Sequence, residues 1–182
     1  MVAIVIKSLS ILTLAGGVLA DALFLLFFWT RKKRVSSGII GFITDTTQKY
    51  GILFAWIVAT IAMFGSLYLS DIAGLAPCIL CWYQRILMYP QVFILGVASL
   101  RKKTDVIPYA LALSIPGIFL SSFHYWEQIT QNPLIPCKTV GYSVSCTEKF
   151  FMHFGYITIP MMALTAFVLI TLFLLYAKRQ KM

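Results

Sequence analysis

Charged side chains are scarce in this sequence. Only 12% of its 182 residues are Asp, Glu, Lys or Arg, whereas 60% are hydrophobic. Water-soluble domains carry about a quarter charged and about half apolar residues, so the composition argues against both a soluble globular fold and a disordered chain. We expect the chain to lie in lipid, and its length suffices for four or five spans of about 20 residues with short connections.

Acidic residues are scarcer still. Six Asp and Glu stand against fifteen Lys and Arg, which gives a formal net charge of +9. Nucleic-acid binding would need these cations on one solvated face, but short basic clusters instead follow alternate apolar stretches, at 31–34, 101–103 and 178–181. We therefore predict no nucleic-acid partner. The positive-inside rule places the three clusters and the C-terminus in the cytoplasm and the N-terminus outside it.

Five apolar stretches have nearly the length of a membrane span. They cover residues 8–29, 50–70, 82–100, 106–123 and 154–176. We predict an all-α membrane protein with five transmembrane helices. The predicted parts are an N-terminal transmembrane helix with a basic cytoplasmic flank (1–35), a cytoplasmic interfacial segment with a helix start at Asp45 to Gln48 (36–49), a four-helix bundle (50–177) and a basic cytoplasmic tail (178–182).

The first apolar stretch has features of a secretory signal. Lys7 precedes it, and the tripeptide Ala-Asp-Ala at 20–22 has the form of a cleavage site. The apolar run nevertheless continues to Trp29 and is followed by the basic cluster at 31–34, which is a stop-transfer arrangement. We expect the stretch to be retained as a helix.

Cysteine is also rare, and all four cysteines fall in the two connections predicted to lie outside the cytoplasm, where disulfides form and persist. Cys137 and Cys146, taken alone, favour a structural disulfide. Cys78 and Cys81 form a C-x-x-C pair, whose small ring would constrain little chain entropy, so redox chemistry is the favoured interpretation. Four cysteines could also bind zinc, but the eight residues between Cys137 and Cys146 are too many for a zinc knuckle.

The C-x-x-C pair lies where the third apolar stretch begins, directly after Pro77. Backbone N–H groups and the helix dipole at such a helix start stabilise a thiolate. Arg85 follows Cys81 by four residues, which places both on one helix face. The guanidinium of Arg85 either reaches the lipid headgroups or stabilises negative charge on sulfur and on the oxygen of an oxidant in the bilayer.

The nonapeptide at 77–85, Pro-Cys-Ile-Leu-Cys-Trp-Tyr-Gln-Arg, resembles the signature of the DsbB/BdbC family of membrane thiol oxidoreductases. The resemblance spans about residues 50–176 and includes 122–125, 136–137, Cys146 and 155–162. It implies a four-helix bundle of the DsbB type, here with one extra N-terminal helix, in the bacterial plasma membrane. Such a protein re-oxidises a thioredoxin-like, DsbA-like partner and passes the electrons to quinone, either ubiquinone or menaquinone, in the lipid pool.

The resemblance also implies roles for single residues. Cys137 would form the mixed disulfide with the partner, and Cys146 would carry the exchange to Cys78. Cys81 would reduce the quinone with the help of Arg85. His124 would bind or protonate the quinone, although a histidine at a span end is also common as an interfacial residue. We interpret His153, which lies among aromatic residues, as part of an interfacial belt.

Two departures from the family pattern concern the partner loop and the first helix. Gln84 occupies a position that is acidic in some relatives, and the loop between Cys137 and Cys146 is shorter than in the DsbB branch. The first helix lies outside the resemblance and carries Asp21 near its middle. We hypothesise that Asp21 relays protons to the reduced quinone, with helix packing as the simpler alternative.

Two other classes of protein remain open. A vitamin K epoxide reductase-like enzyme also combines sulfur and quinone chemistry, but its C-x-x-C pair normally lies in the last helix. A non-catalytic membrane scaffold would use its cysteines as structural or metal-binding groups.

Overall fold

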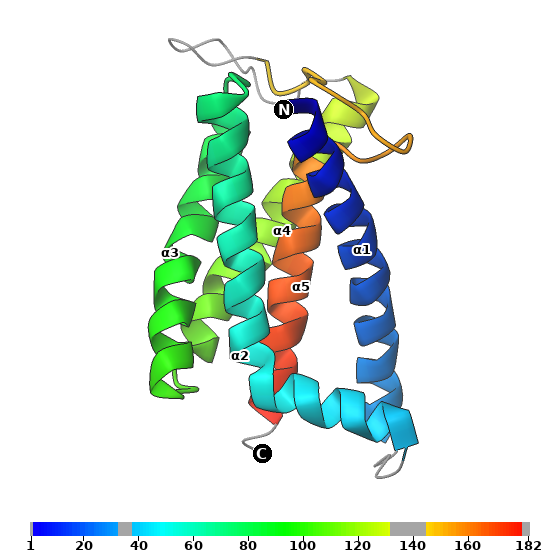
Figure 1. Cartoon of the computed structure of the whole chain (residues 1–182), viewed down its shortest axis with the longest axis vertical. Helices are drawn as coiled ribbons and strands as arrows, with labels where there is room; N and C mark the ends of the chain where they lie inside the picture. The colour runs from blue at the N-terminus through cyan, green and yellow to red at the C-terminus, as the bar shows by residue number, and fades with distance from the viewer. Residues whose placement is uncertain (1, 33–37, 132–144, 180–182) are drawn as a thin grey trace.

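The computed structural model describes residues 2–32, 38–131 and 145–179. Five long helices run side by side within these ranges (Figure 1). They are α1 (Val2–Lys32), α2 (Gly38–Leu67), α3 (Ile79–Arg101), α4 (Ile107–Thr130) and α5 (Ile159–Arg179), and the short π-helix η1 (Tyr68–Ile72) follows α2. The predicted all-α class is confirmed.

Four of the five long helices are apolar and long enough to cross a membrane. They are α1 to Thr30, α2 together with η1, α4, and α5. Among the described helices, α3 has sufficient length at 23 residues, but Gln84, Arg85 and Gln91 make it more polar. It packs against α2 and α4, so it belongs to the same bundle. Large apolar side chains such as Leu25, Phe93 and Phe119 face outward, as expected where lipid covers the surface.

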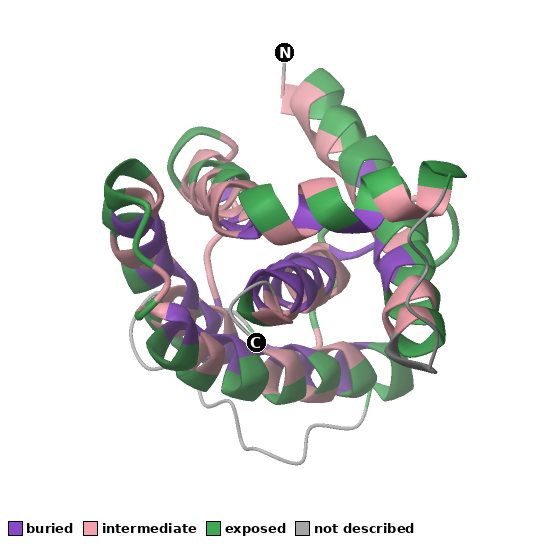
Figure 2. Cartoon of the chain, turned by 90° about the horizontal axis from the view of Figure 1, so that it is seen from below, coloured by how far each residue is buried: buried purple, intermediate pink, exposed green. Residues whose placement is uncertain are grey.

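The helix α5 lies at the centre of the bundle and packs against α1, α2 and α4 (Figure 2). Phe167 and Tyr176 of α5 are fully buried. Two glycines allow neighbouring helices to approach it closely. A Cβ atom at Gly51 of α2 would lie 2.5 Å from the carbonyl oxygen of Phe173, and one at Gly117 of α4 would collide with the ring of Phe167. A larger residue at either glycine would push its helix away from α5.

The first part of α2 crosses one end of the bundle before the helix turns along the bundle axis (Figure 1). This part contains the described residues of the predicted interfacial segment at 36–49, and it presents Ile39 and Phe42 to the outside. The predicted helix start at Asp45 to Gln48 is wrong. The helix begins at Gly38 because the short apolar stretch that follows is itself helical and continues into Asp45 without a break.

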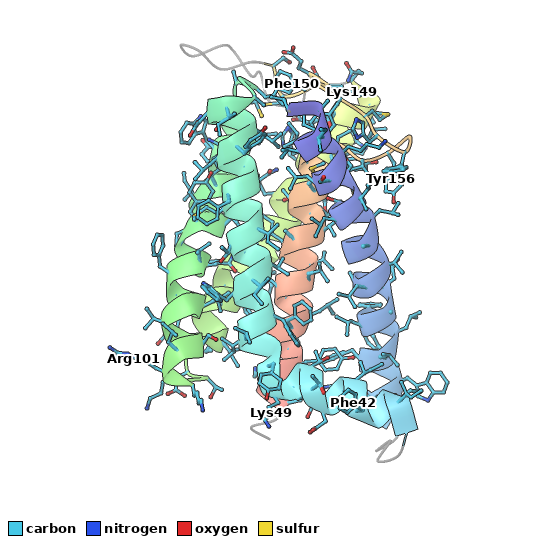
Figure 3. All side chains as sticks on the ribbon, viewed as in Figure 1. Phe42, Lys49, Arg101, Lys149, Phe150 and Tyr156 are labelled. Carbon is cyan, nitrogen blue, oxygen red and sulfur yellow. The ribbon has the colours of Figure 1, made fainter. Side chains whose placement is uncertain are left out.

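The basic residue Arg101 at the end of α3 and the C-x-x-C pair at its start lie at opposite ends of the bundle. Lys49 and Arg101 occupy one end, whereas Lys149, Phe150 and Tyr156 occupy the other (Figure 3). The helix α3 starts at the Phe150 end and finishes at Arg101 (Figure 1). The N-terminal end of α1 lies at the same end as the start of α3.

Candidate active site

Cys78 is the N-cap residue of α3. Its backbone is extended, with φ −75° and ψ 172°, and its sulfur accepts a hydrogen bond from the backbone N–H of Cys81 at 3.4 Å. Pro77 directly precedes it. The expectation that both thiols lie at a helix N-terminus is confirmed.

The sulfur atoms of Cys78 and Cys81 lie 3.2 Å apart as two free thiols. Cys78 is buried and Cys81 is partly exposed. The pKa of Cys78 is lowered from 9.0 to about 4, mainly because the Cys81 thiol hydrogen-bonds to it, with smaller contributions from His124 and from the Cys81 backbone N–H; burial of the sulfur opposes this. Cys78 is therefore the thiol that ionises first at neutral pH.

His124 of α4 connects Cys78 with Gln84. Its Nε2 atom lies 3.5 Å from the Cys78 sulfur, and its Nδ1 atom lies 3.0 Å from the Gln84 amide nitrogen. An amide nitrogen only donates, so Nδ1 accepts and the proton of the neutral ring is on Nε2, facing the sulfur. Gln84 thus selects the tautomer of His124 that can donate to a Cys78 thiolate. Both side chains are buried.

Arg85 is held by the neighbouring helix α2. Its Nε atom donates to the Ser66 hydroxyl at 3.0 Å, and its Nη2 atom donates to the Ser66 carbonyl at 3.1 Å. The Tyr89 hydroxyl donates to the same Ser66 hydroxyl at 3.4 Å, and the guanidinium lies 5.2 Å from the Trp82 ring centroid. Two directional hydrogen bonds fix the guanidinium, which a side chain extended towards lipid headgroups would not have.

A cavity of about 370 Å³ lies beside these residues. Its walls come from α1, α2, α3 and α5, from Leu69 of η1, from the segment 75–77 and from Phe150. Most of its lining side chains are apolar. Cys81 and Arg85 border it. The hydroxyls of Thr13 and Thr165, which also border it, donate to carbonyl groups of their own helices. The polar groups directed at a ligand are therefore concentrated near Cys81 and Arg85, as in a site for an apolar molecule with a polar head.

Cys146 is disulfide-bonded and packs in a small buried cluster with Cys78 and Leu80. Cys81, Leu120 and Phe123 pack against this cluster. Cys81 also borders the cavity, whereas Cys78 and Cys146 are not among the residues that line it. Cys137 lies outside the described residues.

The remaining predicted residues lie elsewhere. Among the described residues, His124 contacts Cys78 rather than the cavity wall. Asp21 is exposed on α1 and does not border the cavity, so the geometry does not support a proton relay. His153 contacts the hydroxyl of Ser10 on α1 through Nδ1 at 2.9 Å, in addition to lying among aromatic residues.

The same residues could hold a metal ion. The ligand atoms of Cys78, Cys81 and His124 all lie within 4.8 Å of one another. Two thiolates and an imidazole suit zinc, with one coordination position left open. This arrangement requires both thiols to be reduced.

Sequence reasoning did not find Ser66 or Tyr89. The spacing of four between Arg85 and Tyr89 could have placed both on one face of α3. Ser66 lies 19 residues before Arg85, and no local pattern in the sequence pairs the two residues.

Comparisons with known proteins point to one family. The family described as "Disulfide bond formation protein DsbB" matches residues 48–177. The "Disulfide bond formation protein C" of Bacillus subtilis (strain 168) is 47% identical over 129 residues, which cover 70% of this chain and 91% of that protein. The "Probable disulfide formation protein C" of Halalkalibacterium halodurans is 42% identical over 71% of this chain and 93% of its own length. A "Probable disulfide formation protein" of Coxiella burnetii is 37% identical over 71% of this chain and 88% of its own length. No solved structure matches the chain.

Proposed function

The chain belongs to the DsbB family of disulfide bond formation proteins, and from this premise we propose that it is a thiol:quinone oxidoreductase of the bacterial plasma membrane. It re-oxidises a thioredoxin-like, DsbA-like partner and passes the electrons to ubiquinone or menaquinone. One observation carries the proposal: Cys81 and Arg85 border an apolar cavity, while Cys78, which does not line it, is packed with the disulfide-bonded Cys146.

The proposed orientation places the cysteine end outside the cytoplasm. Lys49 and Arg101 at the other end of the bundle support a cytoplasmic location for that end (Figure 3). The N-terminus is then extracytoplasmic, and the C-terminus is cytoplasmic. A partner that acts on exported proteins would meet the cysteines on the extracytoplasmic side.

The residues of the cavity fit a quinone. Its volume lies within the range of small-molecule pockets, and its apolar walls suit a prenyl chain. Cys81 and Arg85 would hold the ring, with Ser66 and Tyr89 fixing the guanidinium. A bound quinone supplies an acceptor for two electrons and two protons.

The outer exchange transfers electrons from the partner to the cysteine pair that we assign as Cys137 and Cys146. A thiolate of the partner attacks Cys137, the bond between Cys137 and Cys146 breaks, and Cys146 leaves as a thiolate. The second thiolate of the partner then displaces Cys137 and completes the disulfide of the partner. Two electrons now reside on Cys137 and Cys146.

The inner exchange carries these electrons to the C-x-x-C pair. The Cys146 thiolate attacks Cys78 of the oxidised pair, and Cys81 leaves as a thiolate facing the cavity. The Cys137 thiolate next attacks Cys146 and releases Cys78, whose thiolate is stabilised by His124 and by the helix N-terminus. Cys81 takes up one of the protons that the thiols of the partner release. The reduced pair then has the 3.2 Å sulfur contact seen here, across which this proton can pass to Cys78 when Cys81 gives up electrons. Oxidation of the pair by the acceptor restores the disulfide.

The direct test uses the purified protein with a reduced thioredoxin-like protein and a quinone. We expect one quinone to be reduced for every two thiols oxidised, with no oxidation when quinone is omitted. Thiol titration and the absorbance of the quinone measure the two sides. Absence of coupled turnover with both quinone classes would contradict the proposal.

A metal-binding protein is the second candidate, because Cys78, Cys81 and His124 could share an ion. Metal analysis of the purified, reduced protein distinguishes the two functions. One tightly held zinc ion per chain together with no bound quinone would favour the metal-binding protein. A vitamin K epoxide reductase-like enzyme is disfavoured, because the C-x-x-C pair begins α3 rather than the last helix.

A further inference from the structure

The helix α1 is not covered by the family match, which begins at residue 48, yet it borders the cavity. Six of its residues line the wall, and each lies three or four positions from another of them: Leu9, Leu12, Thr13, Ala15, Gly16 and Leu19. This spacing is that of a single helical stripe. The side chains of Leu12 and Leu19 are each about half exposed, at 52% and 45%. Other side chains of this chain therefore leave about half of their surface uncovered.

The helix α1 is attached near both ends, to the segment before α5 at one end and to α5 itself at the other. Near its N-terminus, the buried Ser10 hydroxyl contacts Nδ1 of His153 at 2.9 Å. Near its C-terminus, the Tyr176 hydroxyl donates to the Leu23 carbonyl at 2.9 Å, and Arg179 donates to the Phe27 carbonyl at 3.1 Å.

The middle of α1 approaches α5 closely. A Cβ atom at Gly16 would lie 3.2 Å from Leu169 and 3.3 Å from Thr165. At the end near the C-x-x-C pair, Leu9 also contacts α2, because a Cβ atom at Gly65 would lie 3.3 Å from the Leu9 side chain. These contacts hold α1 against α5 and bring Leu9 close to α2.

We propose that α1 forms the outer wall of the acceptor cavity and binds the prenyl tail of the quinone, so that this chain selects acceptors with a tail. The inference rests on the proposed function. The occupant follows from continuity: one cavity connects Cys81 and Arg85 with the apolar stripe of α1, so a molecule with its polar ring at Arg85 extends its apolar part along Leu12 and Leu19. A phospholipid acyl chain has a similar apolar chemistry, and the test separates the two.

The test compares Leu12→Trp, which fills the cavity beside α1, with Val18→Trp, which places the same ring on a part of α1 that is 67% exposed and does not border the cavity. For Leu12→Trp we expect the KM for a tailed quinone to rise about tenfold, equivalent to about 1.4 kcal/mol. The KM for a tail-less benzoquinone should change less than about twofold, within the scatter of a surface substitution. Val18→Trp should resemble the unchanged protein with both acceptors.

Two readouts do not depend on activity. Solvent extraction and mass analysis should find less quinone retained by purified Leu12→Trp than by Val18→Trp. A quinone with a diazirine in its tail should label the α1 peptide that contains Leu12. Excess unlabelled tailed quinone should suppress this labelling, whereas tail-less quinone and phospholipid should not. Leu19→Trp serves as a second variant if Leu12→Trp does not fold.

The outcomes separate the two claims. If the unchanged protein fails to oxidise its partner with the tailed quinone and also with the tail-less quinone, the proposed function fails. If it turns over normally but Leu12→Trp and Leu19→Trp match Val18→Trp in KM and in quinone content, only the role of α1 fails. Suppression of the label by phospholipid would identify the occupant as lipid and overturn the role of α1.

Discussion

Gln84 and His124 face each other across α3 and α4, with the amide nitrogen 3.0 Å from Nδ1 of the ring. The opposite ring nitrogen lies 3.5 Å from the Cys78 sulfur. A neutral amide therefore sets the hydrogen-bonding state of the imidazole that supports the thiolate.

Gln84→Leu should raise the pKa of Cys78, because His124 loses the donor that keeps its Nδ1 unprotonated. The rate of iodoacetamide alkylation of the reduced protein, measured against pH, reports this pKa. Gln91→Leu is the matched control, since Gln91 is a buried glutamine of the same helix that bonds to Ser114 instead. Equal pH profiles for the two variants would show that Gln84 does not act through His124.

The low pKa of Cys78 predicts how the stability of the reduced protein depends on pH. The pKa of Cys78 is about 4 in the folded protein, against the ordinary thiol value of 9.0 in the unfolded chain. Between pH 4 and pH 9 the unfolded chain binds one proton more than the folded protein, so the free energy of unfolding rises with pH. The stabilisation by the Cys78 thiolate is complete above about pH 9 and is lost as the pH falls through about 4. Thermal unfolding from pH 4 to 9 should show this slope in the reduced protein and a smaller one in Cys78→Ser.

Cys81→Ser should abolish quinone reduction with every thiol substrate, because the sulfur that faces the cavity is lost. Cys137→Ser should block turnover with the protein partner but allow turnover with a small dithiol that reaches the inner pair directly. Quinone absorbance with each of the two substrates measures both activities. Equal loss in both variants with both substrates would refute the proposed division of roles.

Ser66→Ala should raise the KM for quinone, because Arg85 loses the hydroxyl acceptor of its Nε atom. A hydrogen bond to a charged group contributes about 1.5–3 kcal/mol, so a rise of about ten- to a hundredfold is expected. Ser66→Thr keeps a hydroxyl and should restore most of the activity. If alanine and threonine give the same KM as serine, the contact does not position Arg85 for the acceptor.

Asp21→Asn should leave turnover unchanged, because Asp21 is exposed on α1 and lies away from the cavity wall. Quinone reduction by the reconstituted variant checks this. A clear loss of turnover would revive the proton relay that its place in the first helix suggested.

Local signals in the sequence account for the predictions that succeed. The helix class follows from the apolar stretches, and the position of Cys78 at a helix start follows from Pro77 and the apolar run after it. The spacing of four residues predicted that Cys81 and Arg85 share one helix face, and both border the same cavity. Each of these inferences needs only neighbours within a few turns of helix.

Contacts between distant segments could not be predicted in this way. Gln84 and His124 are 40 residues apart, and Ser10 and His153 are 143 residues apart. Their pairing depends on how the helices pack, which periodicity within one helix does not specify. The start of α2 at Gly38 was missed for a different reason, because a plausible capping sequence at Asp45 competes with the helix-forming stretch before it.

The central position of α5 has a consequence for biosynthesis. The helices α1, α2 and α4 all pack against α5, which is the last of the five to leave the ribosome. The earlier helices therefore enter the bilayer without their common packing partner, and the pocket beside Cys81 closes only when α5 inserts. If the pocket holds the acceptor as we propose, a chain that lacks α5 has no complete acceptor site, and electron transfer from the cysteines can begin only after the last helix is in place.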